Sequence, residues 1–138
     1  MDTGAVFEGT ANLFSSDPAL VVPGSQVILF ALPTDRHEIY LQSMLPHLQE
    51  GIMMGSMPGE GGFVLGAALT NQCILFSLKT LPWACRIETF GNLVRVLRTK
   101  QDIDLCVLPG TQLAALRDLL QAMIGPLPSS MDRTRPFF

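Results

Sequence analysis

The chain has 138 residues, of which 48% are hydrophobic and 15% charged, with nine Lys plus Arg against twelve Asp plus Glu. This length suits one domain, and the apolar content excludes an intrinsically disordered chain. The net charge of −3 offers no basic surface to a nucleic acid or an anionic membrane, so neither is expected as a partner.

Membrane insertion, secretion and disulfide bonding are not expected either. The longest unbroken apolar run covers residues 27–32, far short of the roughly 18 to 20 residues that cross a bilayer. The first residues lack the basic flank and apolar stretch of a secretory signal, which favours the cytosol. Cys73, Cys85 and Cys106 form no Cys-x-x-Cys pair, so they are expected to be reduced thiols and not zinc ligands.

The first predicted elements are a strand and a helix. Residues 26–32 are a continuous β-prone apolar run, typical of a strand covered on both faces. A helix is predicted over 35–48, with Thr34 as its N-cap. Pro46 is expected to distort the last turn, and Gly51 stands where a left-handed cap belongs.

The middle of the chain continues the alternation of strand and helix. Strands are predicted over 52–57 and 73–78, separated by a glycine-rich loop and a short helix candidate over 63–69. Alternation of this kind predicts an α/β fold with a partial, Rossmann-like parallel sheet, right-handed crossovers and flanking helices.

The last third predicts a hairpin, a strand and a helix. Two short segments between residues 87 and 100 surround Gly91-Asn92, and a further strand is expected over 105–108. A helix over 111–123 is predicted to be capped by Thr111 and to turn four side chains inward: Leu113, Leu116, Leu120 and Met123. Residues 1–125 are therefore assigned to one domain, and 126–138 to a flexible tail.

Ligands of a parallel sheet bind where its strands end, so the loops that open at Pro33, Pro58 and Thr80 should converge. Gly59, Gly61 and Gly62 in the second loop would let the backbone approach an anion, or they make only a tight turn. A complete Gly-x-Gly-x-x-Gly dinucleotide motif starting at Gly59 is absent.

Two further sets of residues have open roles. His37 follows the first strand, where it could touch a cofactor or pack as a core histidine. Trp83, Cys85 and Arg86 are expected in a loop at a strand end, where they could recognise a planar or anionic ligand, or Trp83 could plug the edge of the core. The sequence contains no nucleophile in a strand-turn-helix elbow and no histidine pair with metal-ligand spacing.

The hexapeptide Leu-Pro-Trp-Ala-Cys-Arg at 81–86 leads to a family resemblance. It is followed by Phe90-Gly91, Val94 and Leu97-x-Thr99-Lys100, and preceded by Ala31-Leu-Pro-Thr34, His37-Glu38, Leu48-x-x-Gly51 and Pro58-Gly59-x-Gly61-Gly62-Phe63. In these residues, roughly 17–110, the chain resembles the second half of the NAD(P)-binding domain of the octopine/opine dehydrogenase family.

The resemblance implies a reductive condensation of a keto acid such as pyruvate with an amino acid, using NADH or NADPH. It places one set of residues at the cofactor and its nicotinamide or keto-acid end: Leu32, Pro33, Thr34, His37, Gly59, Gly61 and Gly62. A second set lies near the substrate cleft: Trp83, Cys85 and Arg86. No residue of this chain is assigned a catalytic acid or base, because the family supplies these from its helical domain. Lys79 stands where the family often has an acidic residue, so recognition of a cationic amino acid is not implied.

The family's first βαβ unit, with its glycine motif, and its helical substrate domain have no counterpart in these 138 residues. One hypothesis is therefore a partial opine dehydrogenase, a fragment that is inactive alone. The alternative is a noncatalytic Rossmann-like module that acts by associating with another chain. In the alternative, the exposed edge of the strand over 27–32 would mediate association.

Overall fold

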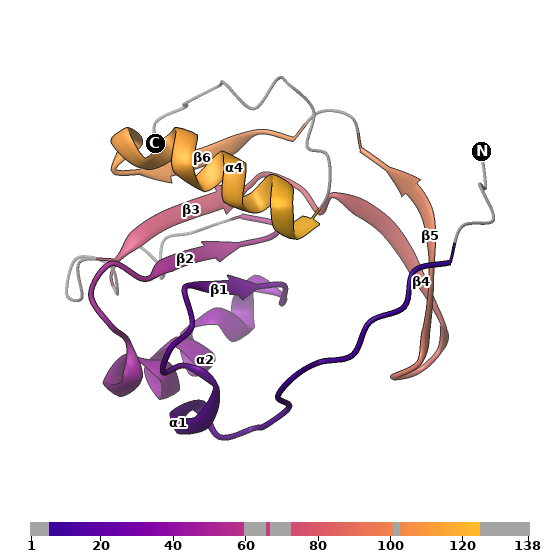
Figure 1. Ribbon diagram of the computed structural model, residues 1–138, viewed down its shortest axis with the longest axis horizontal. Coiled ribbons are helices and arrows are strands. Elements are labelled where there is room, and N and C mark those ends of the chain that lie inside the picture. Colours follow the sequence, from indigo (N-terminus) through magenta and orange to yellow (C-terminus); the bar gives the residue numbers. More distant parts are fainter. Residues whose placement is uncertain (1–5, 60–65, 67–72, 101–102, 125–138) are drawn as a thin grey trace.

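A four-stranded sheet between helices forms the centre of the computed structural model, which describes residues 6–59, 66, 73–100 and 103–124 (Figure 1). The predicted helix over 63–69 (Gly66 apart), Gly61, Gly62 and the predicted tail lie outside the described residues. The elements in chain order are α1 (Pro18–Val21), β1 (Val27–Phe30), the 3-10 turn η1 (Thr34–Arg36), α2 (His37–Met44), η2 (Leu45–His47), β2 (Met53–Ser56), β3 (Ile74–Leu78), β4 (Trp83–Thr89), β5 (Leu93–Thr99), β6 (Leu105–Leu108), η3 (Gly110–Gln112) and α4 (Leu113–Ile124).

The strand order is β1-β2-β3-β6. β1, β2 and β3 are parallel, which confirms the predicted parallel sheet, and their ends are level because Phe30 is in register with Ser56 and Ser56 with Ser77. β6 runs antiparallel to β3, a direction that the sequence did not predict. The chain reaches β6 from a hairpin that starts and ends at the carboxyl end of β3, so no crossover to the other end is needed.

Two apolar clusters cover the two faces of the sheet. α2 closes one face, where Leu41 packs with Phe30, Met54 and Leu75. α4 closes the opposite face, where its buried residues pack against Phe76, Leu78, Leu105 and Val107. Figure 1 shows the two helices on either side of the sheet, so the fold is a three-layer α/β arrangement, as expected.

The inward face of α4 was predicted correctly except at its last position. Leu116 and Leu120 are 0% exposed, and Leu113 packs against their cluster. The prediction for Met123 was wrong, since it is 51% exposed. Ile124 packs against the cluster in its place, one turn beyond Leu120.

The predicted helices over 35–48 and 111–123 each begin with a 3-10 turn after a proline, and these turns have no side-chain cap. Thr34 lies within η1 and Thr111 within η3, and neither turn has a side-chain capping bond, so both N-cap predictions were wrong. The predicted distortion at Pro46 is confirmed, because α2 ends at Met44 and continues as η2. Gly51 has the predicted left-handed backbone, with φ of +79°.

The hairpin of β4 and β5 is longer than predicted. Its first strand begins at Trp83 and not at residue 87, so the prediction that Trp83, Cys85 and Arg86 lie in a loop was wrong. In Figure 1 the hairpin stands apart from the main sheet, beyond the carboxyl end of β3, and the segment before α1 runs in its direction. No helix in the described parts of the chain is long and apolar enough to span a membrane.

Candidate functional site

The carboxyl ends of β1, β2 and β3 form one continuous edge, as the sequence predicted for ligand loops of a parallel sheet. After β2, the Met57 amide donates to the Phe30 carbonyl at 2.8 Å, and the Gly59 amide donates to the Leu78 carbonyl at 2.9 Å. The segment that leaves β2 is thus bonded to β1 on one side and to β3 on the other. We call this region, the ends of β1–β3 with the segments that follow them, the carboxyl edge.

His37 is enclosed at this edge. Its side chain is 0% exposed, its ring centroid lies 5.4 Å from that of Phe30, and its Nε2 lies 3.1 Å from the Leu32 carbonyl oxygen. This burial agrees with the core-histidine alternative. Leu32 and Thr34 are half-buried and Pro33 is exposed, so the predicted cofactor contacts of this loop involve accessible residues.

Gly59 is required for a close approach between chain segments. A Cβ at this position would collide with Ser77 Oγ, stand 2.8 Å from Ser77 Cβ and lie 3.2 Å from the Leu78 carbonyl oxygen. The Gly59 amide also donates a hydrogen bond to this Leu78 carbonyl, at 2.9 Å. A tight packing contact with β3 therefore accounts for this glycine, which neither the anion-binding nor the tight-turn alternative included.

Three buried polar atoms at the carboxyl edge have no hydrogen-bond partner among the described residues: His37 Nδ1, Ser56 Oγ and Thr80 Oγ1. They follow β1, end β2 and follow β3, respectively. Ser56 is two positions from Met54 on β2, so both side chains point to the α2 face, where His37 also lies. Buried polar atoms without partners are rare in native proteins and indicate a bound ligand or an ordered water.

The described charged groups around this edge are paired or exposed. Lys79 follows β3 directly, and its Nζ lies 3.3 Å from Asp104 Oδ2, while its amide donates to the Asp104 carbonyl. In η1, Arg36 Nε lies 3.4 Å from Asp35 Oδ2, and both side chains are largely exposed. No group of three metal-ligating side chains occurs in the part of the chain that the structure describes.

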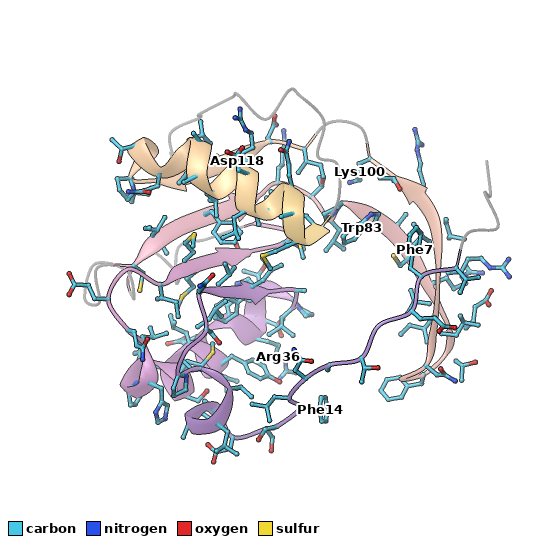
Figure 2. The ribbon with its side chains drawn as sticks, in the orientation of Figure 1. Phe7, Phe14, Arg36, Trp83, Lys100 and Asp118 are labelled. Carbon is cyan, nitrogen blue, oxygen red and sulfur yellow. The ribbon has the colours of Figure 1, made fainter. Side chains whose placement is uncertain are left out.

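Trp83, Cys85 and Arg86 lie on β4, on the hairpin. Trp83 is half-buried, whereas Cys85 and Arg86 are exposed. Cys85 stands opposite Val96, and Arg86 opposite Arg95. Because neighbouring residues of a strand point to opposite faces, Arg86 and Cys85 cannot contact one ligand surface together unless the ligand wraps around the hairpin. Figure 2 shows Trp83 on the hairpin side, away from Asp118 on α4.

Sequence reasoning missed the serines that end β2 and β3. Ser56 and Ser77 are 0% and 8% exposed and directly in register, so they place two hydroxyl groups side by side at the carboxyl edge. In the sequence, each of these serines is a polar residue near the end of an apolar strand. This pattern indicates a shared site only when β2 and β3 are known to be neighbours in the sheet.

No protein-family model matches the chain. Three curated relatives match most of it: an opine dehydrogenase of Haliotis discus hannai (35% identity over 75% of this chain), an octopine dehydrogenase of Pecten maximus (35% over 72%) and a tauropine dehydrogenase of Arabella iricolor (32% over 85%). Over this segment the chain is homologous to the opine dehydrogenases. The resemblance that the sequence motifs indicated is thereby confirmed. The chain spans 27%, 26% and 31%, respectively, of the lengths of these opine dehydrogenases.

Solved structures agree with this relationship. An octopine dehydrogenase in complex with NADH and agmatine covers 91% of this chain with a TM-score of 0.75 and 29% identity, and the chain covers 32% of it. Octopine dehydrogenase with NADH and L-arginine covers 80% with a TM-score of 0.70 and 31% identity, and the chain covers 30% of it. A putative 2-dehydropantoate 2-reductase from Enterococcus faecalis, at 13% identity and a TM-score of 0.54, shares the fold.

Proposed function

We propose that the carboxyl edge forms the nicotinamide side of an NAD(P)H site in an opine dehydrogenase-like oxidoreductase. The observation that carries this proposal is the set of three unpartnered buried polar atoms, His37 Nδ1, Ser56 Oγ and Thr80 Oγ1, at the ends of three adjacent parallel strands. Ligands of open α/β sheets bind outside these strand ends. The homologous octopine dehydrogenase structures were solved with NADH, which supports the choice of cofactor.

The chemistry of this edge fits one end of the dinucleotide. Its unpartnered groups are hydroxyls and an imidazole nitrogen, which suit a neutral carboxamide that both donates and accepts hydrogen bonds. Lys79 and Arg36 each lie beside an aspartate, whose negative charge reduces their attraction for a pyrophosphate. We therefore assign the exposed or half-buried residues Leu32, Pro33, Thr34 and Gly59 to the nicotinamide side. The family resemblance adds Gly61 and Gly62, which lie outside the described residues.

The proposed reaction joins a keto acid to the amino group of an amino acid, and a bound reduced nicotinamide supplies the hydride. In this proposal, the residues of this chain bind and orient the cofactor. In the described part of the carboxyl edge, His37 is buried and bonded to Leu32, and Lys79 is paired with Asp104. Neither is available as a general acid or base for the reacting amine. We accordingly propose that the 138-residue chain has no turnover alone, and that Trp83, Cys85 and Arg86 border the amino-acid side in the whole enzyme.

The test combines an activity assay with a binding assay. The purified chain is mixed with NADH or NADPH, pyruvate and a panel of amino acids, and the absorbance of the reduced cofactor is followed against a heat-killed control. Calorimetric titration of each cofactor measures binding separately. We expect no keto-acid-dependent oxidation and weak cofactor binding that is lost in Ser56→Val. Turnover would contradict the proposed inactivity, and binding unaffected by Ser56→Val would contradict the assigned edge.

A second candidate function is association with another chain. Among the described strands, β1 is paired only with β2, and the hairpin exposes the apolar side chains of Ile87, Val94 and Val96 by 61%, 53% and 54%. Open strand edges and exposed apolar patches favour association. Light scattering across a concentration series distinguishes the candidates, because a chain that acts by self-association must form a defined oligomer.

A further inference from the structure

The segment between β1 and α2 is held by a side chain and not by a strand ladder. Its backbone makes two local bonds, from Arg36 N to the Pro33 carbonyl at 3.0 Å and from His37 N to the Thr34 carbonyl. A side chain five residues further along supplies a third bond: His37 Nε2 lies 3.1 Å from the Leu32 carbonyl oxygen. The first residue of α2 therefore turns back to bind the first half of the loop.

The His37 ring is itself fixed on the other side. It is 0% exposed and packs against Phe30, the last residue of β1, with an interplanar angle of 53°. Phe30 precedes the loop and His37 follows it, so this ring contact and the bond to Leu32 span the loop from its start to its end. Because the ring is shielded from water, its hydrogen bond to Leu32 restricts the loop more than a fully exposed bond would.

The hydrogen-bond pattern determines the tautomer. A carbonyl oxygen only accepts, so Nε2 must carry the hydrogen that it donates to Leu32. Nδ1 is buried without a partner among the described residues and is left as the acceptor nitrogen.

We propose that His37 is a positioning residue that, as its Nε2–H tautomer, clamps the Leu32 carbonyl and so fixes the loop at the nicotinamide side of the carboxyl edge. The part of this inference that concerns the cofactor rests on the proposed function. Its Nε2 is bonded to the Leu32 carbonyl and so is not free for a dinucleotide. The influence of this nitrogen on binding passes through the position of Leu32, Pro33 and Thr34.

The first test uses the 138-residue chain itself. Long-range ¹H–¹⁵N NMR of histidine-labelled protein identifies the protonated ring nitrogen, and His47, the second histidine of the chain, provides an internal comparison. We expect a fixed Nε2–H tautomer for His37. A protonated Nδ1 with a bare Nε2 would overturn the proposal.

The second test uses matched variants. His37→Gln retains a side-chain donor of similar reach, whereas His37→Leu retains volume without a donor, and His47→Leu controls for the loss of a histidine from the same helical segment. We expect hydrogen exchange of the Arg36 and His37 amides, which donate the two local bonds of the loop, to rise in His37→Leu by up to about tenfold, the effect of losing one hydrogen bond. In His37→Gln it should stay near the wild-type rate.

NADH titration of the same variants separates the two proposals. If the wild-type chain binds NADH, His37→Leu should weaken the affinity by up to about tenfold, and His37→Gln and His47→Leu should leave it within about twofold. If the wild-type chain does not bind NADH, the proposed function fails, while the tautomer and the exchange rates still decide the role of His37. Equal exchange rates in wild type and a folded His37→Leu would overturn that role.

Discussion

Replacing Gly59 with alanine tests the packing that joins the segment after β2 to β3. The new methyl group would collide with Ser77 Oγ and stand 2.8 Å from Ser77 Cβ, closer than such carbons approach in native structures. Overpacking of this kind costs about 1–3 kcal/mol. Alanine also lowers the conformational entropy of the unfolded chain, which stabilises the folded state by about 0.4–1 kcal/mol. We therefore expect a net loss of about 1–2 kcal/mol, or a fall in Tm of about 4–8 °C for a domain of this size.

Urea denaturation followed by circular dichroism gives the free energies of unfolding for a double-mutant cycle. Ser77→Gly removes the two nearest of these atoms, and the third, the Leu78 carbonyl oxygen, lies at 3.2 Å. Gly59→Ala should then cost less in the Ser77→Gly background by about 1 kcal/mol or more, within the usual range for residues in contact. Gly110→Ala is the control, because nothing lies within 4 Å of a Cβ at that position.

Two results would refute this reasoning. One is additivity of Gly59→Ala and Ser77→Gly to within about 0.5 kcal/mol, as is found for sites that do not touch. The other is equal stability of Gly59→Ala and Gly110→Ala, which would mean that the methyl group meets no obstacle.

Three further predictions concern the core and the thiols. Leu120→Ala should destabilise the fold by about 2–5 kcal/mol in the same urea assay, since Leu120 is 0% exposed, whereas Met123→Ala, at 51% exposure, should change the stability by less than about 0.5 kcal/mol. Gly55→Ala on the central strand β2 should cost about 1–3 kcal/mol, because the added Cβ meets the ring of a buried phenylalanine on β3, and an unchanged Tm would contradict this. Iodoacetamide should modify the exposed Cys85 before Cys73, because burial raises the pKa of Cys73 and so lowers its thiolate fraction. The labelling rate at Cys73 should rise with pH. Peptide mass spectrometry measures both rates, and equal labelling of the two thiols would count against this prediction.

Continuous apolar runs made the central strands predictable from the sequence. The runs over 26–32, 52–57 and 73–78 contain β1, β2 and β3, because strands buried on both faces need apolar side chains at most positions. The direction of β6 was not predictable, since a pattern of buried residues is the same for either direction of the chain. It is decided by where the hairpin returns the chain to the sheet.

The candidate site was predictable only where its residues follow a strand. The positions of Leu32, Pro33 and Gly59 at the carboxyl edge follow from the strand ends and the α/β topology. The Ser56–Ser77 neighbourhood depends on the register between two strands, which the local sequence does not contain. Trp83 to Arg86 were assigned to the loop that opens at Thr80, after the strand over 73–78, yet a new strand begins at Trp83, directly after Pro82.

The hairpin of β4 and β5 is inserted between β3 and β6, two antiparallel neighbours that a simple turn could otherwise join. Leu78 at the end of β3 lies opposite Leu105 at the start of β6, and the Lys79–Asp104 pair closes a segment whose ends are 25 positions apart. Closure entropy rises by only about 0.6 kcal/mol for each doubling of such a segment. A segment of different length or sequence could therefore replace the β4–β5 hairpin while β3 and β6 stay paired. Insertions and deletions in the hairpin should be tolerated far better than in the parallel strands.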